Sequence, residues 1–568
     1  MKYKVHINDR TYSSWSWINE ETMTETQPDP EWRPHKIFSK DIILYDPDTK
    51  TSHTTYSHVR SKIPLAGILV LDGNRSFGRT AKTHKLLYKC IPDDRHLPTF
   101  LVPYDPPIRF SKVLKNKYVV FQFDHWDDQH PRAKLTTTIG DVDQLDSFYE
   151  YQLHCKSLHI SITQFSNNAR EQLQKQANAD YIEQILQDPH LHIEDRRQSH
   201  AQPFSIDPDN STDFDDAFSI HQDPHTQNTH ITIYIANVYV WLDALHLWKS
   251  FASRVSTIYL PDRKRPMLPT ILSDSLCSLQ ENQPRFAFAM DLIFTPQNEL
   301  IHTSFHQVLI TVIKNYRYES PHLLSSPVYQ SLYDLTRSLD KSVSDSHDVV
   351  SYWMVRMNAI CGKQMATSKI GIFRQATFTR TVQDIPIDTV MTDGAKRTIT
   401  MWNNVAGQYV LFHDDIKHDV MKVANYTHTT SPIRRLVDLL NQLWMLTEFG
   451  LVSKLSEEAD EFLQGWLRQL EYINTSMRSI RKIQTDCEVL HRCITTPGLM
   501  DTPHEGILFD KLQKNDGGFI YMVYLEGLNL LTRLKTYEEQ ENYSKHQFRL
   551  FFFMDEHSLK QKIRVQII

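Results

Sequence analysis

The chain has 568 residues, of which 40% are hydrophobic and 23% are charged, and its formal net charge is −6. This length predicts three or four domains, and the composition is ordinary for a soluble globular protein. A dedicated nucleic-acid binder is usually basic, so the charge of the whole chain does not predict that partner. The six scattered cysteines form no CxxC pair, and no apolar run is long enough to span a membrane. We therefore expect a soluble protein of a reducing compartment, the cytoplasm or else the nucleus, without structural zinc.

The two ends of the chain are predicted to form small β-structures. Residues 1–60 are polar with weak strand alternation, and we expect an N-terminal extension or a reduced barrel there. Over 61–158, β-type runs such as AGILVL, KLLYKC and KYVVFQF alternate with Pro, Gly and Asp turns, which is typical of a small barrel. The tail, 498–568, contains similar runs, among them GFIYMVYL and FRLFFFM, and predicts a second small barrel.

A long domain of mixed α and β structure is expected over 159–497. It opens with strands such as FSID and HITIYIANV. Near its end, one helix is predicted to start at Ser431, which can cap it, with Pro at the first helical position, and to end near Gly450. A second helix is predicted from apolar residues at helical spacing between Phe462 and Ile480.

Two short basic clusters could provide local positive potential in an otherwise acidic chain. On composition alone, a solvated surface face is the simpler interpretation of each. The first cluster comprises Arg75, Arg79, Lys82, Lys85 and Lys89, and the second comprises Arg263, Lys264 and Arg265.

The most informative segment is FSIDPDNSTDFDDAFSI, residues 204–220, which places five acids between two strand-like pieces: Asp207, Asp209, Asp213, Asp215 and Asp216. Carboxylates this close repel one another, and burying them costs several kcal/mol unless cations neutralise them. Divalent ions with oxygen ligands, Mg²⁺ in particular, are the natural solution. Two such ions can activate a water and stabilise an in-line phosphoryl displacement, so hydrolysis of a phosphodiester is the reaction class indicated.

Two other interpretations of this acidic segment are open. The spacing D-x-D-x-S-x-D matches the first ligand positions of an EF-hand calcium loop. Thr212, however, stands where that loop needs Gly, and Phe218 stands where it needs the bidentate Glu. The second alternative is a solvated acidic turn, which the flanking strands disfavour.

The second informative segment is YTHTTSPIRRLVDLL, residues 426–440. A helix capped at Ser431 would expose free N–H groups and a positive dipole end next to Arg434 and Arg435. Such a helix start binds anions, and a guanidinium can hold phosphate through two parallel hydrogen bonds. The alternative is that both arginines pair with acids such as Asp438.

These segments resemble one known family, the RNase II/RNase R (RNB) exoribonucleases, which include the catalytic subunit of the exosome. SIDPDNSTDFDDA is similar to the family signature TIDP-x₅-D-x-DDA, and the segment from Tyr426 to Leu436 is similar to YTHFTSPIRRY. Between them, STIYLPDRKRPMLPTILSDSLCSL resembles TSVYLPDR-x-x-PMLP-x-x-LS-x-x-LCSL. The layout is closest to that of the exosome-type subunit, without its endonuclease domain.

The resemblance implies an α+β multidomain fold, in which a central RNB catalytic domain is flanked by small OB-type barrels. That domain is a mixed sheet with surrounding helices and a deep channel. The barrel over 61–158 would be a cold-shock-like OB barrel, and the tail would be an OB-type RNA-binding barrel.

The resemblance also implies the roles of individual residues at the metal site. Asp207 and Asp216 would ligate Mg²⁺ directly, with Mn²⁺ able to substitute. Asp213 and Asp215 would complete the metal site, with Asp215 the most critical for the chemical step. A Glu that the family carries on the following long helix has two candidate counterparts, Asp486 and Glu488.

A further set of residues would bind RNA. Arg434 would hold the scissile phosphate and the charge that develops there, and Tyr259 would stack on the 3′-terminal base. Arg435, Thr430 and Ser431 would add contacts to the phosphate backbone.

The activity implied is processive, hydrolytic 3′→5′ degradation of single-stranded RNA to nucleoside 5′-monophosphates. The protein would act as a monomer or within a larger RNA-decay assembly. The chain departs from the family at Asn237, Leu436 and Gln442, and these changes keep an alternative open. That alternative is a weak or silent RNA-binding protein on the same scaffold.

Overall fold

The structure, a computed structural model, describes all residues except 107–113, 377–390, 403–406, 419–422, 515–516 and 556–558. The chain forms two compact units, which are described separately. The first comprises Met1–His159, Leu260–Asp262 and Lys482–Ile568. The second comprises Ile160–Tyr259 and Arg263–Arg481. None of the described helices has the length and apolarity required to cross a bilayer.

The first 56 residues form a five-stranded antiparallel sheet in the first unit. Alternate residues of its first strand, Tyr3, Val5 and Ile7, are buried and pack against Trp17 and Ile43. The strand order is β3-β2-β1-β4-β5, with bounds β1 (Lys2–Ile7), β2 (Trp15–Asn19), β3 (Glu25–Thr26), β4 (Ile42–Asp46) and β5 (Thr51–Tyr56).

The next five strands close into a barrel, in the order β10-β8-β7-β6-β9. Its core includes Tyr88, Phe100, Val119 and Phe121, drawn from the apolar runs that predicted it. The bounds are β6 (Leu65–Leu69), β7 (Leu87–Pro92), β8 (Phe100–Pro103), β9 (Lys117–His125) and β10 (Arg132–Asp141), followed by α1 (Leu145–Cys155).

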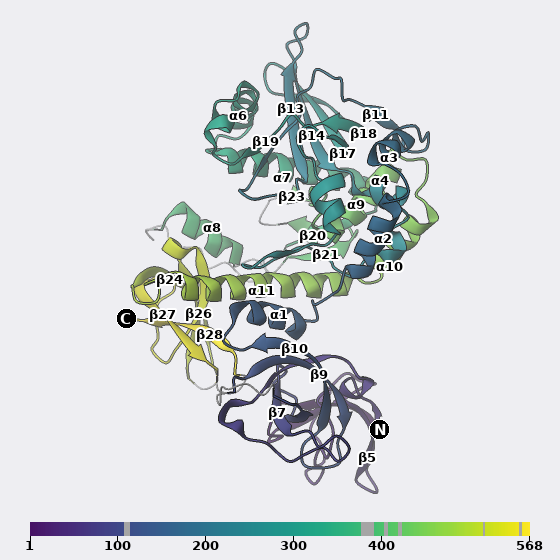
Figure 1. The fold of residues 1–568 in the computed structure, drawn as a ribbon. Helices are drawn as coiled ribbons and strands as arrows, with labels where there is room; N and C mark the ends of the chain where they lie inside the picture. The colour runs from purple at the N-terminus through teal and green to yellow at the C-terminus, as the bar shows by residue number, and fades with distance from the viewer. Residues whose placement is uncertain (107–113, 377–390, 403–406, 419–422, 515–516, 556–558) are drawn as a thin grey trace. The chain divides into compact units, whose positions relative to one another are not determined.

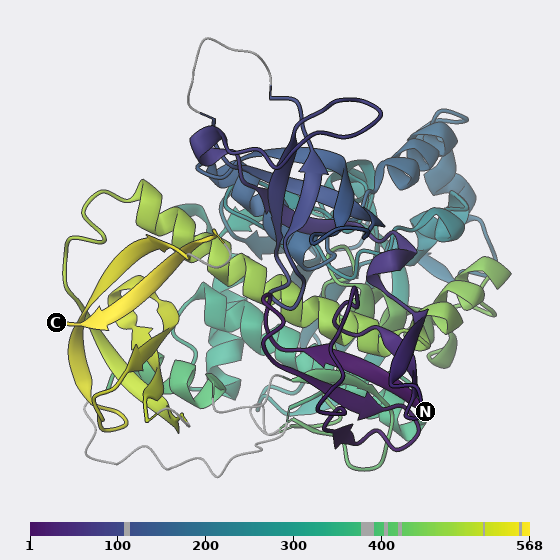
Figure 2. The same ribbon diagram turned by 90° about the horizontal axis from the view of Figure 1, so that it is seen from below.

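The C-terminal part of the first unit is a second five-stranded antiparallel sheet whose outer strands, β26 and β28, come into contact. Figure 2 distinguishes the three β-structures of this unit by colour. The order is β26-β25-β24-β27-β28, with bounds β24 (His504–Gln513), β25 (Phe519–Leu525), β26 (Leu530–Thr536), β27 (Lys545–Met554) and β28 (Gln561–Ile567).

The second unit is built on a seven-stranded sheet in the order β11-β18-β17-β14-β13-β12-β19 (Figure 1). The pairs β11–β18 and β12–β19 are parallel and the other neighbours are antiparallel. The bounds are β11 (Ile193–Asp195), β12 (Phe204–Asp207), β13 (Asp216–Gln222), β14 (Thr229–Ala236), β17 (Pro284–Phe294), β18 (Leu300–Thr311) and β19 (Lys314–Arg317).

Helices and short strands complete the described part of the second unit. The short strands pair as β15 (Ile258–Tyr259) with β16 (Lys264–Arg265), β20 (Ile372–Gln375) with β21 (Gln408–Leu411), and β22 (Lys417–His418) with β23 (Val423–Ala424). The helices are α2 (Thr163–Leu173), α3 (Asn178–Leu186), α4 (Val238–Ala244), α5 (Pro321–Leu324), α6 (Pro327–Leu339), α7 (Ser346–Thr367), α8 (Asp393–Trp402), α9 (Leu436–Glu448), α10 (Glu457–Leu467) and α11 (Leu470–Thr495), whose last residues belong to the first unit.

The α+β multidomain class predicted from the sequence is confirmed, but the helix predicted between Phe462 and Ile480 was wrong. The apolar residues between Phe462 and Ile480 lie on two helices, because the chain leaves α10 at Leu467 and begins α11 at Leu470. Helical spacing continues across that short break, so periodicity alone did not reveal it. The domain boundaries predicted at 60, 158 and 497 stay predictions.

Candidate active site

The acidic segment is a loop between two neighbouring strands of the central sheet. β12 ends at Asp207 and β13 begins at Asp216, and these antiparallel strands pair at Phe204 and Phe218. The ends of the loop are therefore held by the sheet. Asp207 is 8% exposed, Asp215 2% and Asp216 9%, so the carboxylates at the strand ends are buried.

Asp207 and Asp216 carry the least compensated charge of the loop. Neither forms an ion pair with the described residues. Asp207 Oδ2 accepts a 2.6 Å hydrogen bond from Ser205, whereas Asp216 Oδ2 is buried and accepts none. Burial raises the pKa of Asp207 to about 7, and burial together with repulsion from Asp207 raises the pKa of Asp216 well above its usual range. A bound cation would relieve both costs.

Asp215 is instead bound on both oxygens by the arginine segment, which lies 219 positions away in the chain. Ile433 N donates to Oδ1 at 3.0 Å, and Arg434 Nε donates to Oδ2 at 2.8 Å. Burial raises the pKa of Asp215 to about 6, although the charge of Arg434 and these hydrogen bonds oppose the rise. The Arg434 side chain remains 43% exposed, so part of its guanidinium can still meet a phosphate.

The helix start predicted at Ser431 was wrong. Helix α9 begins at Leu436, and the residues before it form turns, with Arg435 in extended conformation. Two carboxylates accept hydrogen bonds from backbone N–H groups that a helix start would leave free. Ser431 N donates to Asp438 at 2.8 Å, and Ile433 N donates to Asp215. An anion does occupy this turn, but it is a side chain of the protein.

Both arginines pair with acids, as in the alternative interpretation of the sequence: Arg434 pairs with Asp215, and Arg435 pairs with Asp438. Arg435 Nη2 donates to Asp438 Oδ1 at 2.8 Å, and Asp438 is fully buried. Thr430 and Ser431 are each 3% exposed, and their hydroxyls accept hydrogen bonds from Asn358 and Arg434. Ser431 thus contacts Arg434 directly, and the direct contact of Arg435, Thr430 and Ser431 with RNA stays a prediction.

Tyr259 and Lys264 meet the fourth signature aspartate. The β15–β16 pairing puts these two residues opposite each other. Tyr259 donates its hydroxyl to Asp213 Oδ2 at 3.2 Å, and Lys264 Nζ donates to Asp213 Oδ1 at 2.9 Å. Tyr259 is 42% exposed, so the rest of its ring can receive a base.

Sequence reasoning missed two residues of this region. Lys264 was interpreted as part of a basic surface cluster, and Asp274 was passed over inside LSDSLCSL. Lys264 Nζ also donates to Asp274 Oδ1, at 3.0 Å. Burial lowers the pKa of Lys264, but the hydrogen bonds to Asp213 and Asp274 outweigh burial and the pKa is raised. The sequence signal that could have revealed Lys264 was a charged residue at one of the two variable positions inside the PDR-x-x-PMLP motif.

The three residues that depart from the family pattern, Asn237, Leu436 and Gln442, make structural contacts. Asn237 is buried and donates to Gln307 at 2.7 Å. Gln442, also buried, donates to the carbonyl of Ala236 at 3.1 Å, and Leu436 is fully buried. These residues support β14 and α9, and the hydrogen bonds described for Asn237 and Gln442 go to groups other than the signature carboxylates.

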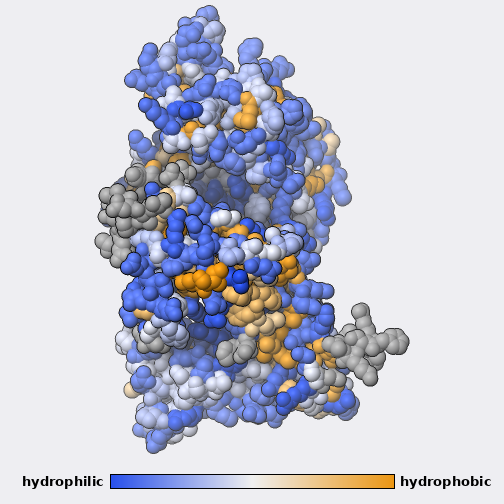
Figure 3. Space-filling model, turned by 90° about the vertical axis from the view of Figure 1, so that its left-hand side faces the viewer, coloured by the Kyte–Doolittle hydropathy of each residue, from blue (hydrophilic) through white to orange (hydrophobic). Residues whose placement is uncertain are grey.

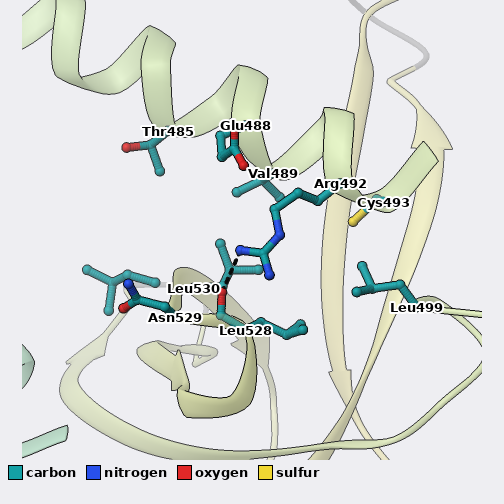
Figure 4. Close-up of a pocket in the computed structure, with 10 residues that line it drawn as sticks. Thr485, Glu488, Val489, Arg492, Cys493, Leu499, Leu528, Asn529 and Leu530 are labelled. Atoms are coloured by element: carbon teal, nitrogen blue, oxygen red, sulfur yellow. Dashed lines mark hydrogen bonds between the residues drawn. The ribbon is translucent and has the colours of Figure 1, made fainter. Parts of the chain in front are cut away.

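Asp486 and Glu488, the two candidate counterparts of the family Glu, lie in the first unit and have different neighbours. Burial raises the pKa of Asp486, against the charges of nearby basic residues such as Lys482 and Lys560. Glu488 lines a cavity of about 250 Å³ together with Arg492, which donates to the carbonyl of Leu528 (Figure 4). This cavity contains none of the signature aspartates. Which acid corresponds to the family Glu stays a prediction.

The carboxylates fit Mg²⁺ as a partial ligand set. Within the part of the chain that the structure describes, no three Asp, Glu, His or Cys side chains are grouped so as to hold a metal by themselves. Mg²⁺, however, is usually bound by one or two carboxylates, with water and substrate phosphate as the other ligands. The Asp207–Asp216 pair, with an unpartnered oxygen on Asp216, matches that arrangement.

Comparison with known proteins places this site in a family. The family model described as "RNB domain" matches residues 196–327, which include the acidic loop, the β15–β16 pair and Asp274. Residues 196–327 of this chain therefore match an RNB domain. The resemblance drawn from the sequence is thus confirmed.

Relatives match parts of the chain in sequence. Ribonuclease R of Chlamydia pneumoniae is 38% identical over 113 residues, 20% of this chain and 16% of that protein. Exosome complex exonuclease RRP44 of Mus musculus is 24% identical over 226 residues, 39% of this chain and 22% of that protein. The chain thus spans less than a quarter of the length of these curated relatives.

Two solved structures share the fold over nearly the whole chain. Mycoplasma genitalium RNase R, in complex with ribose methylated single-stranded RNA, superimposes with a TM-score of 0.70 over 100% of both chains at 15% identity. Yeast Ssd1, a pseudonuclease, gives a TM-score of 0.58 over 97% of this chain and 80% of that chain at 13% identity.

Proposed function

We propose that this RNB-domain protein is a Mg²⁺-dependent exoribonuclease that degrades single-stranded RNA processively from its 3′ end and releases nucleoside 5′-monophosphates. Mn²⁺ would be able to replace Mg²⁺. The observation that supports this most is the juxtaposition in one loop of two uncompensated buried acids, Asp207 and Asp216, with the Asp215–Arg434 pair. The protein would work as a monomer or within a larger assembly, as the name of its relative RRP44 suggests for that protein.

The residues of this site have separate tasks in the proposed reaction. Mg²⁺ held by Asp207 and Asp216 would supply an activated water and neutralise charge on the phosphate. Arg434 points its exposed guanidinium edge at the phosphate and stabilises the charge that develops there. Asp215 fixes Arg434 through Nε, so the guanidinium is already positioned before RNA arrives. Tyr259 offers a ring face to the terminal base without distinguishing its identity.

The small β-structures of the first unit carry surfaces suited to single-stranded RNA. On the first barrel, Arg75 and Lys89 lie 5.5 Å and 4.7 Å from the ring centre of Phe77. On the C-terminal sheet, β27 exposes Phe551, Phe552 and Phe553 by 37–40%, and Figure 3 shows hydrophobic surface on the face that carries it. Basic and aromatic side chains together bind single strands through phosphate contacts and base stacking.

The assignment is tested by Asp215→Asn. A 5′-labelled oligoribonucleotide is incubated with Mg²⁺, and the shortened fragments and released nucleotides are resolved. We expect hydrolysis to fall by at least about 10³-fold, because Arg434 loses its anchor and the site loses a charge, while RNA binding persists. The matched control is Asp209→Asn, an exposed aspartate of the same loop, which should cleave normally. Undiminished cleavage by Asp215→Asn would contradict the proposal.

A catalytically silent RNA-binding protein is the second candidate. The shared fold with the pseudonuclease Ssd1 and the contact between Lys264 and Asp213 favour it. The unpartnered oxygen of Asp216 disfavours it, because a silent scaffold gains nothing from burying that charge. RNA binding by the wild type without release of nucleotides, in Mg²⁺ and in Mn²⁺ alike, would establish this second function.

A further inference from the structure

The ammonium group of Lys264 is bound inside the acidic site like a small cation. Its three N–H donors reach three oxygens: Asp213 Oδ1 at 2.9 Å, Asp274 Oδ1 at 3.0 Å and Thr212 Oγ1 at 2.7 Å. An ammonium has three donors, so all of them are satisfied within the protein. Only 25% of the side-chain surface is exposed. Lys264 is therefore a component of the site and is not a solvated surface lysine.

Local structure holds the oxygens around this ammonium in place. Asp274 lies in the single helical turn Leu272–Leu276 and accepts hydrogen bonds from Ser273 at 2.6 Å and from Thr212 at 3.1 Å. Asp213 accepts its second hydrogen bond from Tyr259. Both carboxylates would thus be in place for a metal ion if Lys264 were absent.

The charges of the site indicate how many divalent ions it can hold. Among the residues that the structure describes, five carboxylates are gathered here and three positive side chains contact or face them, which leaves two negative charges. Two negative charges are neutralised by one divalent ion. The acids are Asp207, Asp213, Asp215, Asp216 and Asp274, and the positive side chains are Lys264, Arg317 and Arg434.

We propose that the Lys264 ammonium takes the place of a second divalent ion, so that this chain binds a single divalent ion, at Asp207 and Asp216. Two-metal phosphodiesterase sites need carboxylates for each ion, about 4 Å apart. Here the carboxylates available to a second ion, Asp213 and Asp274, are both occupied by Lys264. Lys264 is thus a positioning residue: its ammonium, which is part of the protein, stands where a divalent ion from solution would otherwise bind. The inference rests on the metal site of the proposed function.

The test counts bound Mn²⁺ by electron paramagnetic resonance on the full chain. The wild type should bind one ion tightly, and Asp207→Asn should weaken that ion by about 100-fold. Lys264→Met removes the ammonium and frees Asp213 and Asp274, so the count should rise to two. Lys264→Arg keeps the positive charge in place and should restore a count of one.

Two ions in the wild type, or one ion in a folded Lys264→Met protein, would overturn the proposal. If circular dichroism shows that Lys264→Met does not fold, Asp213→Asn decides the question in the presence of Lys264. Under the proposal Asp213 is not a ligand, so Asp213→Asn should weaken Mn²⁺ binding by less than about tenfold, through the loss of one nearby negative charge alone. A loss of about 100-fold would overturn the inference.

The ion count is independent of RNA cleavage. A wild type that binds one Mn²⁺ but releases no nucleotide refutes the proposed nuclease and leaves the role of Lys264 standing. A wild type that cleaves RNA with two bound ions refutes the role of Lys264 and leaves the nuclease standing.

Discussion

Two regions of this molecule withdraw aspartates wholly or partly from solvent and treat their charge differently. In the first unit, Asp93 pairs with Lys560, whose Nζ also lies 5.4 Å from the ring centre of Tyr151, and both charged side chains are less than 20% exposed. The charge of Asp93 is thus met by a cation of the protein itself. In the second unit, the loop from Asp207 to Asp216 gathers more acids than its cations neutralise. A balanced pair holds structure together, whereas an unbalanced cluster is suited to binding a cation from solution.

The largest effect should come from replacing Arg434, the arginine of the acidic cluster. Arg434→Met should lower kcat for RNA hydrolysis by about 10³-fold, because it removes the charge that meets the phosphate and leaves Asp215 buried without its partner. Initial rates at saturating RNA measure this change. Arg337→Met, on the exposed face of α6, is the control and should be neutral. A loss below tenfold would show that Arg434 serves Asp215 alone.

The balanced pair should affect stability instead of catalysis. Lys560→Met leaves the half-buried Asp93 without its cation, and we expect the free energy of unfolding to fall by about 2 kcal/mol. Urea unfolding of the full chain, monitored by tryptophan fluorescence, provides the measurement. Lys562→Met breaks the exposed pair with Asp555 and should change stability by less than about 0.5 kcal/mol. Equal effects of the two variants would contradict the distinction between buried and exposed pairs.

Tyr259 tests whether the ring or the hydroxyl matters beside the cluster. Tyr259→Ala should weaken RNA binding by about 2 kcal/mol through lost stacking, whereas Tyr259→Phe keeps the ring and should bind RNA normally. Fluorescence anisotropy in the presence of EDTA separates binding from cleavage. Equal weakening by both substitutions would assign the effect to the hydrogen bond with Asp213.

Asp41 extends the comparison to a buried acid that forms no ion pair with the described residues. Burial raises its pKa from 3.8 to about 6, although hydrogen bonds from Ser57 and the Phe38 N–H oppose the rise. The fold therefore favours protonated Asp41. This contribution to stability is full below about pH 4 and is lost as the pH rises through about 6.

Asp41→Asn mimics the neutral form. It should stabilise the protein by about 1 kcal/mol at pH 7.5 and have no such effect at pH 4. Thermal unfolding at the two pH values tests this, with the exposed Asp48→Asn as the control. A stabilisation that is the same at both pH values would show that the charge of Asp41 is not its cause.

Sequence reasoning predicted the parts of the site that lie close together along the chain. The acids of the loop and the strands that flank it follow from local pattern, because Asp207 and Asp216 end and begin strands of one hairpin. The pairing of Asp215 with Arg434 joins distant segments, and no periodicity encodes it. Lys264 was misread for the same reason, since its partners come from two other segments.

The start of α9 shows a second limit of local reasoning. Ser431 and the proline after it form a good helix start by propensity, yet tertiary contacts took the N–H groups that such a start leaves free. The carboxylates of Asp438 and Asp215 occupy the turn that was predicted to bind an anion, and its contact with phosphate stays a prediction. The local preference for a helix start is overridden where a buried carboxylate accepts the hydrogen bonds of the backbone N–H groups.

Asp438 shows that a buried residue behind the reacting groups can determine the geometry of this site. Fully buried, it holds both the Ser431 N–H and Arg435, and thereby sets the turn from which Arg434 projects. Its loss would leave every reactive group present but displaced. A genetic screen that scored only RNA turnover would therefore place Asp438 among the reactive acids, although it never meets the substrate.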